Sequence, residues 1–118
     1  MCSVEIEYAN KAVSRYFMDF GLMGKKRGMD MAKAVKRRFD QLRAADTFLD
    51  FLSLGLGKPH QLAANLKGRY GISVTGNIRL IVKPGVEQLD SVSLGKCKTI
   101  TIEGVVDYHG TKIEWIIP

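Results

Sequence analysis

The chain has 118 residues, of which 46% are hydrophobic and 25% are charged, and its formal net charge is +6. This length and composition predict one globular domain over residues 1–118 and exclude a second domain or a low-complexity chain. Two cysteines and two histidines at unrelated spacings exclude a disulfide scaffold and a metal-ligand set, so we expect no metal and no cofactor.

The first 28 positions predict a strand, a helix and a loop. Residues 4–8 alternate apolar with polar side chains, which is the period of a strand with one solvated face. Asn10 can cap a helix whose apolar stripe continues to Phe20. Glycines at positions 21, 24 and 28 interrupt that stripe and predict a loop.

Two further helices follow. Residues 30–45 predict an amphipathic helix, because their apolar side chains repeat with a helical period: Ala32, Val35, Phe39 and Leu42. Asp46 can cap a short third helix that ends at Gly55 or Gly57.

After residue 59 the hydrophobic period becomes that of strands. Residues 69–75 and 78–83 predict a hairpin around the turn Gly76-Asn77. A two-residue loop would turn Arg79 into the core, whereas a three-residue loop or a bulge leaves it on the polar face. We predict the second arrangement, because a buried, unpaired charge is far more unfavourable than a bulge. The polar face would then carry Lys67, Arg69, Ser73, Arg79 and Lys83.

The remaining residues complete the predicted sheet. Residues 84–97 predict a loop, and residues 98–108 predict a strand with one shared face for Ile100, Ile102, Val106 and Tyr108. Residues 112–118 predict a last extended segment. We therefore predict an α+β fold, in which an N-terminal strand and two to three helices pack on a twisted, mainly antiparallel sheet.

A third of the chain is free of acidic residues. Between Phe51 and Val86 the ionisable side chains are Lys58, His60, Lys67, Arg69, Arg79 and Lys83, apart from one tyrosine. A surface of this kind attracts polyanions, and phosphate backbones are the commonest polyanions in a cell. The histidine among these cations could also transfer protons.

Several short motifs resemble those of one protein family. They are Pro59-His60-Gln61-Leu62, Asn65-Leu66-Lys67-Gly68, Gly76-Asn77-Ile78-Arg79-Leu80 and Asp107-Tyr108-His109. On these motifs, residues 30–109 resemble toxins of the RelE/ParE superfamily, most closely the HigB-like, plasmid maintenance killer branch. The resemblance implies the RelE-like fold and a type II toxin that inhibits translation and growth. Its implied partners are the ribosome, messenger RNA and a cognate antitoxin of helix-turn-helix type, with no small-molecule substrate.

The chemistry of RNA cleavage gives these residues roles. Without a metal, the 2′-hydroxyl of RNA can itself attack the phosphate, which requires a base, an acid and fixed positive charge. We assign Arg79 to phosphate stabilisation and His60 and His109 to the acid and base, in either order. We further expect Lys67 to bind phosphate and Tyr108 to stack on a base or support His109. Three more cations would attract RNA: Lys58, Arg69 and Lys83.

The resemblance leaves alternatives open. RNA-cleaving members of the branch carry a lysine where this chain has Ala63, so Lys67 would have to supply that charge. ParE-like members inhibit DNA gyrase without cutting, and an inactive binding module is a third hypothesis. Residues 110–118 extend beyond the usual end of the family and could shield the histidine, add a strand or hold the antitoxin. The expected location is the cytoplasm, with no membrane partner, because residues 1–7 lack a signal-peptide pattern.

Overall fold

The computed structural model describes residues 4–63, 66–109 and 112–118; Cys2, Gly110 and the side chain of His109 lie outside the described residues. The chain has an α+β fold, which confirms the predicted fold class. The elements in chain order are β1 (Glu5–Tyr8), α1 (Lys11–Met18), α2 (Phe20–Arg27), α3 (Met29–Ala44), α4 (Phe48–Leu54), β2 (His60–Gln61), β3 (Tyr70–Thr75), β4 (Ile78–Pro84), α5 (Ser91–Gly95), β5 (Thr99–His109) and β6 (Lys112–Ile117).

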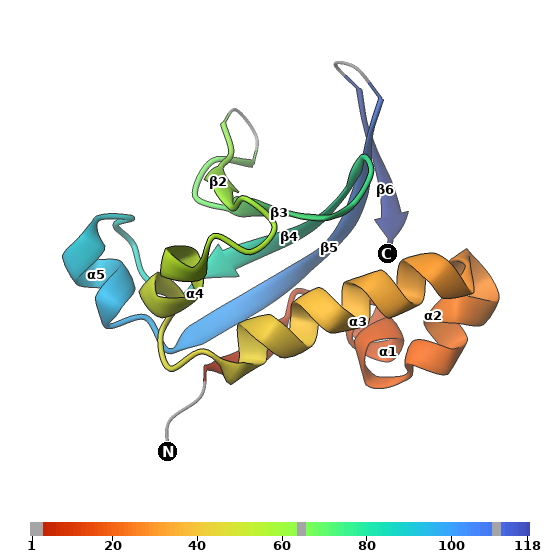
Figure 1. Cartoon of the computed structure of the whole chain (residues 1–118), viewed down its shortest axis with the longest axis horizontal. Coiled ribbons are helices and arrows are strands. Elements are labelled where there is room, and N and C mark those ends of the chain that lie inside the picture. Colours follow the sequence, from red (N-terminus) through yellow and green to blue (C-terminus); the bar gives the residue numbers. More distant parts are fainter. Residues whose placement is uncertain (1–3, 64–65, 110–111) are drawn as a thin grey trace.

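The strands form one sheet in the order β1-β5-β4-β3-β2, and β6 also pairs with β5. β1 runs parallel to β5, whereas the other described pairings are antiparallel. β1 pairs with residues 99–102 and β6 with residues 105–109, so these two strands share one edge of β5. Figure 1 shows α3 running along one face of the sheet, with α1 and α2 beside it. We call this the inner face and the opposite side the outer face.

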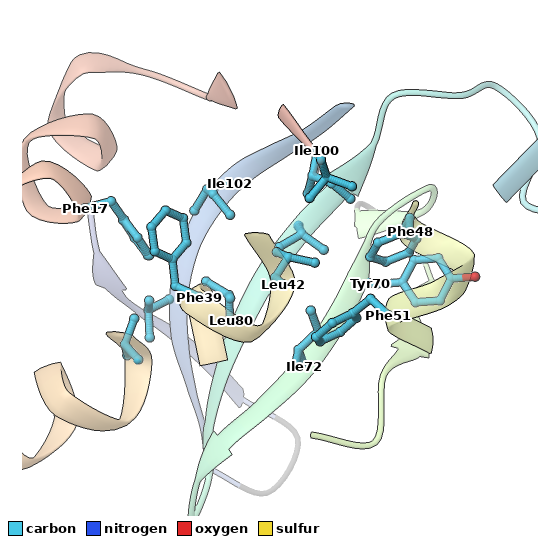
Figure 2. Packing of buried hydrophobic residues seen from close by; sticks show 14 of the residues in the cluster. Phe17, Phe39, Leu42, Phe48, Phe51, Tyr70, Ile72, Leu80, Ile100 and Ile102 are labelled. Atoms are coloured by element: carbon cyan, nitrogen blue, oxygen red, sulfur yellow. The ribbon is translucent and has the colours of Figure 1, made fainter. Parts of the chain in front are cut away.

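The core lies between the helices and the inner face. α3 buries the stripe that its sequence predicts: Ala32, Val35, Phe39 and Leu42. The Phe39 ring lies 5.2 Å from the ring of Phe17 in α1. Figure 2 shows the α3 side chains among Leu80 and Ile102 of the sheet. Each such burial contributes roughly 1.5–3 kcal/mol, so the helix layer and the sheet stabilise each other.

Two segments that the sequence predicts as loops are helical. Residues 20–27 form α2, whose first turn is capped by the Asp19 carboxylate, 3.0 Å from the backbone nitrogen of Leu22. Gly24 is buried, and a Cβ there would collide with Met29, so this glycine permits close packing of α2 on α3. Within residues 84–97, Asp90 caps α5 in the same way, and Thr47 rather than Asp46 caps α4.

The β3–β4 hairpin contains the predicted bulge. Thr75 pairs with Ile78 around the turn, but the register shifts between Ser73 and Thr75, so residue 74 has no partner. Arg79 therefore lies opposite Ser73 on the outer face, and Leu80 joins the core. The prediction that a bulge keeps this guanidinium out of the core is confirmed.

A second bulge reverses the faces of β5. Ile102 pairs with Val82, but the next pair is Gly104 with Ile81, so Glu103 is the extra residue. The predicted shared face of Ile102 and Tyr108 is therefore wrong. Beyond the bulge Val105 joins the core, while Val106 and Tyr108 lie on the outer face with Arg79.

β6 is an integral part of the sheet. Ile117 pairs with Val105 and is fully buried in the core. Arg27 of α2 donates a hydrogen bond from Nε to the Ile116 carbonyl oxygen at 2.8 Å. Three roles for residues 110–118 were left open by the sequence alone. The fold shows one of them, an additional strand in the sheet.

Candidate nucleic-acid interface

Arg79 is held at the β3–β4 turn by its own hairpin. Its Nη1 donates to the carbonyl oxygens of Gly76 at 2.9 Å and Ile78 at 3.3 Å. The guanidinium carbon lies 5.6 Å from the centre of the Tyr108 ring, within the range of a cation–π contact. These contacts fix the direction of the guanidinium and leave its other nitrogens available for two phosphoryl oxygens.

The positive charge of Arg79 is not neutralised within the described part of the chain. The ion pairs between described residues are Lys36–Asp40 and Arg69–Glu103, each at 2.7 Å. Arg79 belongs to neither pair, and its hydrogen-bond acceptors are neutral carbonyls. A partly buried, unpaired guanidinium is a strong site for a phosphate group.

A helix on the other side of the sheet supports this arrangement. Arg38 of α3 donates from Nε to the Ser73 carbonyl oxygen at 3.1 Å, and the Ser73 nitrogen donates to Gly57 at 2.7 Å. Burial lowers the pKa of Arg38, and the charge of Arg37 adds to that effect. Both backbone groups of Ser73 on this edge are thus bound, which stabilises the bulge that positions Arg79. No sequence pattern indicates this role for Arg38.

Arg69 does not contribute free charge, although we expected it to attract RNA. Its Nε lies 2.7 Å from the Glu103 carboxylate, and the two side chains are 25% and 16% exposed. Glu103 is the bulge residue of β5 and lies outside the acid-free segment of the sequence. Its carboxylate nevertheless reaches Arg69, which belongs to that segment. The ion pair neutralises Arg69 in this conformation, and its contact with RNA stays a prediction.

His60 lies on β2, one strand beyond β3. It pairs with Gly71, and its ring covers that glycine, because a Cβ there would lie 3.4 Å from the His60 Cε1. Its Nδ1 is 3.4 Å from the Lys58 carbonyl oxygen, and the side chain is exposed. His60 is therefore accessible to a ligand but is supported by few contacts.

The sheet register separates His60 from His109. His60 shares a row with Gly71, Ile81 and Gly104, whereas His109 lies five residues beyond Gly104 at the end of β5. Standard strand spacing and rise put the two backbones roughly 20 Å apart. Figure 1 shows the adjoining ends of β5 and β6 extending beyond the turn between β3 and β4. The register therefore does not bring the backbones of the two histidines together beside Arg79, and their shared role at one phosphodiester stays a prediction.

The remaining predicted cations are exposed but spread out. Lys67 precedes β3, near the end opposite the Arg79 turn, and lines a hollow together with Gln61 and Glu87. Lys83 lies on β4 opposite Thr101, and Lys58 precedes β2. They do not form one cluster with Arg79. Ala63 is exposed beside Lys67, so no lysine occupies the position that the family resemblance emphasises.

Two further features bear on the kind of site. Within residues 4–63, 66–109 and 112–118, no three His, Cys, Asp or Glu side chains gather closely enough to hold a metal ion. In the same described ranges, no helix has both the length and the apolar content needed to cross a membrane.

The comparisons with known proteins give a likeness of fold. No protein-family model matches the chain, and no curated protein matches it. Among solved structures, YoeB in its complex with YefM from Staphylococcus aureus is 21% identical with a TM-score of 0.53, and the match covers 90% of this chain and 97% of that one. The YoeB dimer from the same organism is 19% identical with a TM-score of 0.53, covering 92% and 99%. This likeness agrees with the expected RelE-like fold.

Proposed function

We propose that this protein is the toxin of a type II toxin–antitoxin system and cleaves messenger RNA without a metal ion. The observation that carries the proposal is the guanidinium of Arg79 beside Tyr108 on the outer face, which forms no ion pair with another described residue. The sequence motifs and the YoeB-like fold support it. The proposed membership of the HigB-like branch depends on the sequence motifs alone.

In the proposed reaction the RNA supplies its own nucleophile. A base takes the proton of a 2′-hydroxyl, its oxygen attacks the adjacent phosphorus, and the bond from phosphorus to the 5′-oxygen breaks. An acid returns a proton to that 5′-oxygen, so the products are a 2′,3′-cyclic phosphate and a 5′-hydroxyl. The phosphorane carries two negative charges, and Arg79 would stabilise it through two N–H groups.

The geometry favours one end of the sheet for this chemistry. Tyr108 contacts Arg79, and His109 is the next residue of β5. We assign the acid to the Tyr108 hydroxyl, which lies on the outer face with Arg79, and the base to His109, whose side chain lies outside the described residues. His60, Lys58, Lys67 and Lys83 would contact flanking phosphates instead.

We also propose an antitoxin partner and a ribosomal setting. YoeB of Staphylococcus aureus forms a heterotetrameric toxin–antitoxin complex with YefM. By analogy, a cognate antitoxin would bind this chain and suppress its activity. The ribosome would present messenger RNA in single-stranded form, which exposes the 2′-hydroxyl to the outer face.

The deciding test is cleavage of a translated messenger by purified protein and ribosomes. We expect Arg79→Ala to lower the cleavage rate by about 100- to 1,000-fold, the usual effect of removing one donor to a developing charge. Arg37→Ala removes the same charge from an exposed position on α3 and should leave the rate within about twofold. Undiminished cleavage by Arg79→Ala would contradict the mechanism.

The products and a second assay separate the alternatives. Cleavage through the 2′-hydroxyl must leave a cyclic phosphate, which end-labelling detects. Intact RNA together with inhibited supercoiling by DNA gyrase would support the ParE-like hypothesis. No effect in either assay, and no growth arrest on expression, would support an inactive binding module.

A further inference from the structure

The outward side of β6 carries two large apolar residues that remain exposed. Ile113 is 43% exposed and Trp115 is 42% exposed. Ile113 pairs with Tyr108, and Trp115 pairs with Val106, which in turn pairs with Arg79. Because directly paired residues share a face of a sheet, these side chains continue the outer face from Arg79 across β5 to β6.

The fold does not need this exposed surface to hold β6 in place. A register shift between Trp115 and Ile117 turns Ile117 to the inward side of the strand, where it is fully buried. The hydrogen bond from Arg27 to the Ile116 carbonyl oxygen anchors the strand further. Exposed tryptophan on an otherwise well-anchored strand points to a ligand, since such side chains are enriched where proteins bind.

Trp115 is oriented by the β5 bulge. A Cβ at Gly104 would lie 2.9 Å from Cζ3 of the indole, so the ring lies against the β5 backbone at this glycine. Gly104 also has a φ of +150°, a conformation that favours glycine. The bulge that reverses β5 therefore also leaves room for the indole and fixes its position.

The charges around this surface favour a polyanion. Arg79 lies two strands from Trp115, roughly 10 Å between backbones by standard strand spacing. The acid of this face, Glu103, is already paired with Arg69. Glu114 pairs with Asp107 and lies between Ile113 and Trp115 along β6. Because successive residues of a strand alternate between faces, Glu114 belongs to the opposite face. An aromatic platform next to an unneutralised guanidinium is the usual arrangement for binding single-stranded nucleic acid.

We propose that Trp115, with Ile113 beside it, stacks on a base of single-stranded RNA whose neighbouring phosphate is bound by Arg79. This inference rests on the proposed function and extends the site onto β6. Arg79 and Trp115 lie two strands apart on one face, so a single strand of RNA that crosses this face can contact both. The base stack would hold the strand in register while Arg79 contacts the scissile phosphate.

The single tryptophan allows a direct test. Full-length protein is titrated with an eight-nucleotide single-stranded RNA that carries 2′-O-methyl groups and so cannot be cleaved. Stacking predicts saturable quenching of the Trp115 fluorescence by this RNA and little quenching by its duplex. Unchanged fluorescence at saturation, with binding followed by anisotropy of labelled RNA, would overturn the proposal.

Matched variants locate the contact. We expect Trp115→Ala to weaken binding about tenfold and Trp115→Phe to keep most of it, because one stacked base contributes such a factor. Ile113→Ala should weaken binding less. If Trp115→Phe binds RNA no better than Trp115→Ala while both unfold at the same urea concentration as the parent, the stacking role is wrong.

The outcome is separable from that of the proposed function. Quenching by single-stranded RNA without any cleavage would support the stacking surface and contradict the nuclease. Normal cleavage and RNA affinity in Trp115→Ala would contradict the stacking surface and leave the nuclease standing. Loss of antitoxin binding in Trp115→Ala, with RNA affinity unchanged, would identify a protein as the occupant and overturn the inference.

Discussion

The two faces of the sheet differ in what their side chains do. The inner face is covered by helices, and its residues pack in one apolar core in which Phe39 and Leu42 are buried. The outer face presents Arg79, Tyr108 and Trp115, which are partly exposed and have few protein partners. The same strands supply both faces, and register shifts in β3, β5 and β6 decide which side each residue joins. Stability and binding should therefore respond to different substitutions.

The largest expected effect is on the inner face. Phe39→Ala should lower the free energy of unfolding by about 3–5 kcal/mol, because it removes buried aromatic surface and leaves a cavity. Urea unfolding followed by circular dichroism measures this value. Val92→Ala, at a position that is 69% exposed, is the control and should change stability by less than about 0.5 kcal/mol. Similar free energies of unfolding for the two variants would contradict the conclusion that the inner face provides the stability.

The bulge at Gly104 should affect both faces at once. Gly104→Ala should lower stability by about 1–3 kcal/mol, because its φ of +150° strains any other residue and a Cβ meets the backbone of Ile117. The Trp115 emission should shift in the same variant. Gly95→Ala is the control, since its Cβ would lie at an ordinary 3.4 Å from Leu49. A Gly104→Ala protein with parental stability and emission would show that the bulge does not link the faces.

The Arg69–Glu103 ion pair should stabilise the outer face without taking part in cleavage. A double-mutant cycle with Arg69→Met and Glu103→Gln should give a coupling energy of about 1 kcal/mol, because the partly exposed pair is screened by solvent. Cleavage measured at a temperature where all variants are folded should fall far less than in Arg79→Ala. An equal loss would mean that Arg69 contacts RNA after all.

The smallest effect lies away from both faces. The backbone nitrogen of Ser93 donates to the Asp90 carboxylate, and this bond holds the pKa of Asp90 below its usual range. A carboxyl with a lowered folded-state pKa stabilises the protein above its ordinary pKa of about 4, and the contribution disappears as pH falls through the lowered value. Asp90→Ala should therefore be less stable than the parent at pH 7 but not in strong acid. Asp46→Ala, which removes a carboxylate that does not cap α4, is the control.

Local patterns predicted most of the elements correctly. The α3 stripe, the Asn10 cap and the β3–β4 hairpin each depend on residues close in sequence, and each is present. α2 was missed because the need for a glycine at position 24 comes from Met29 of the next helix, not from the segment itself. The bulge of β5 did have a local sign, since an isolated glycine within a strand often marks one.

The candidate site was harder to predict because it depends on long-range pairing. The strand order separates His60 from the end of β5, and no spacing along the chain reveals that order. Glu103 reaches Arg69 across 34 positions, so an acid-free segment of sequence did not yield an acid-free surface. The position of Arg79 on the polar face was predicted correctly, because the penalty for burying its charge constrained the hairpin locally.

The hydrogen bond from Arg38 to Ser73 connects the helix layer to the strand that lies beside Arg79. Arg38 belongs to the helix layer, yet it holds the strand segment opposite Arg79. A molecule that binds α3 and breaks this hydrogen bond would release that segment and disorder the guanidinium on the outer face. An inhibitor could therefore bind the helix layer and reduce activity without covering the outer face.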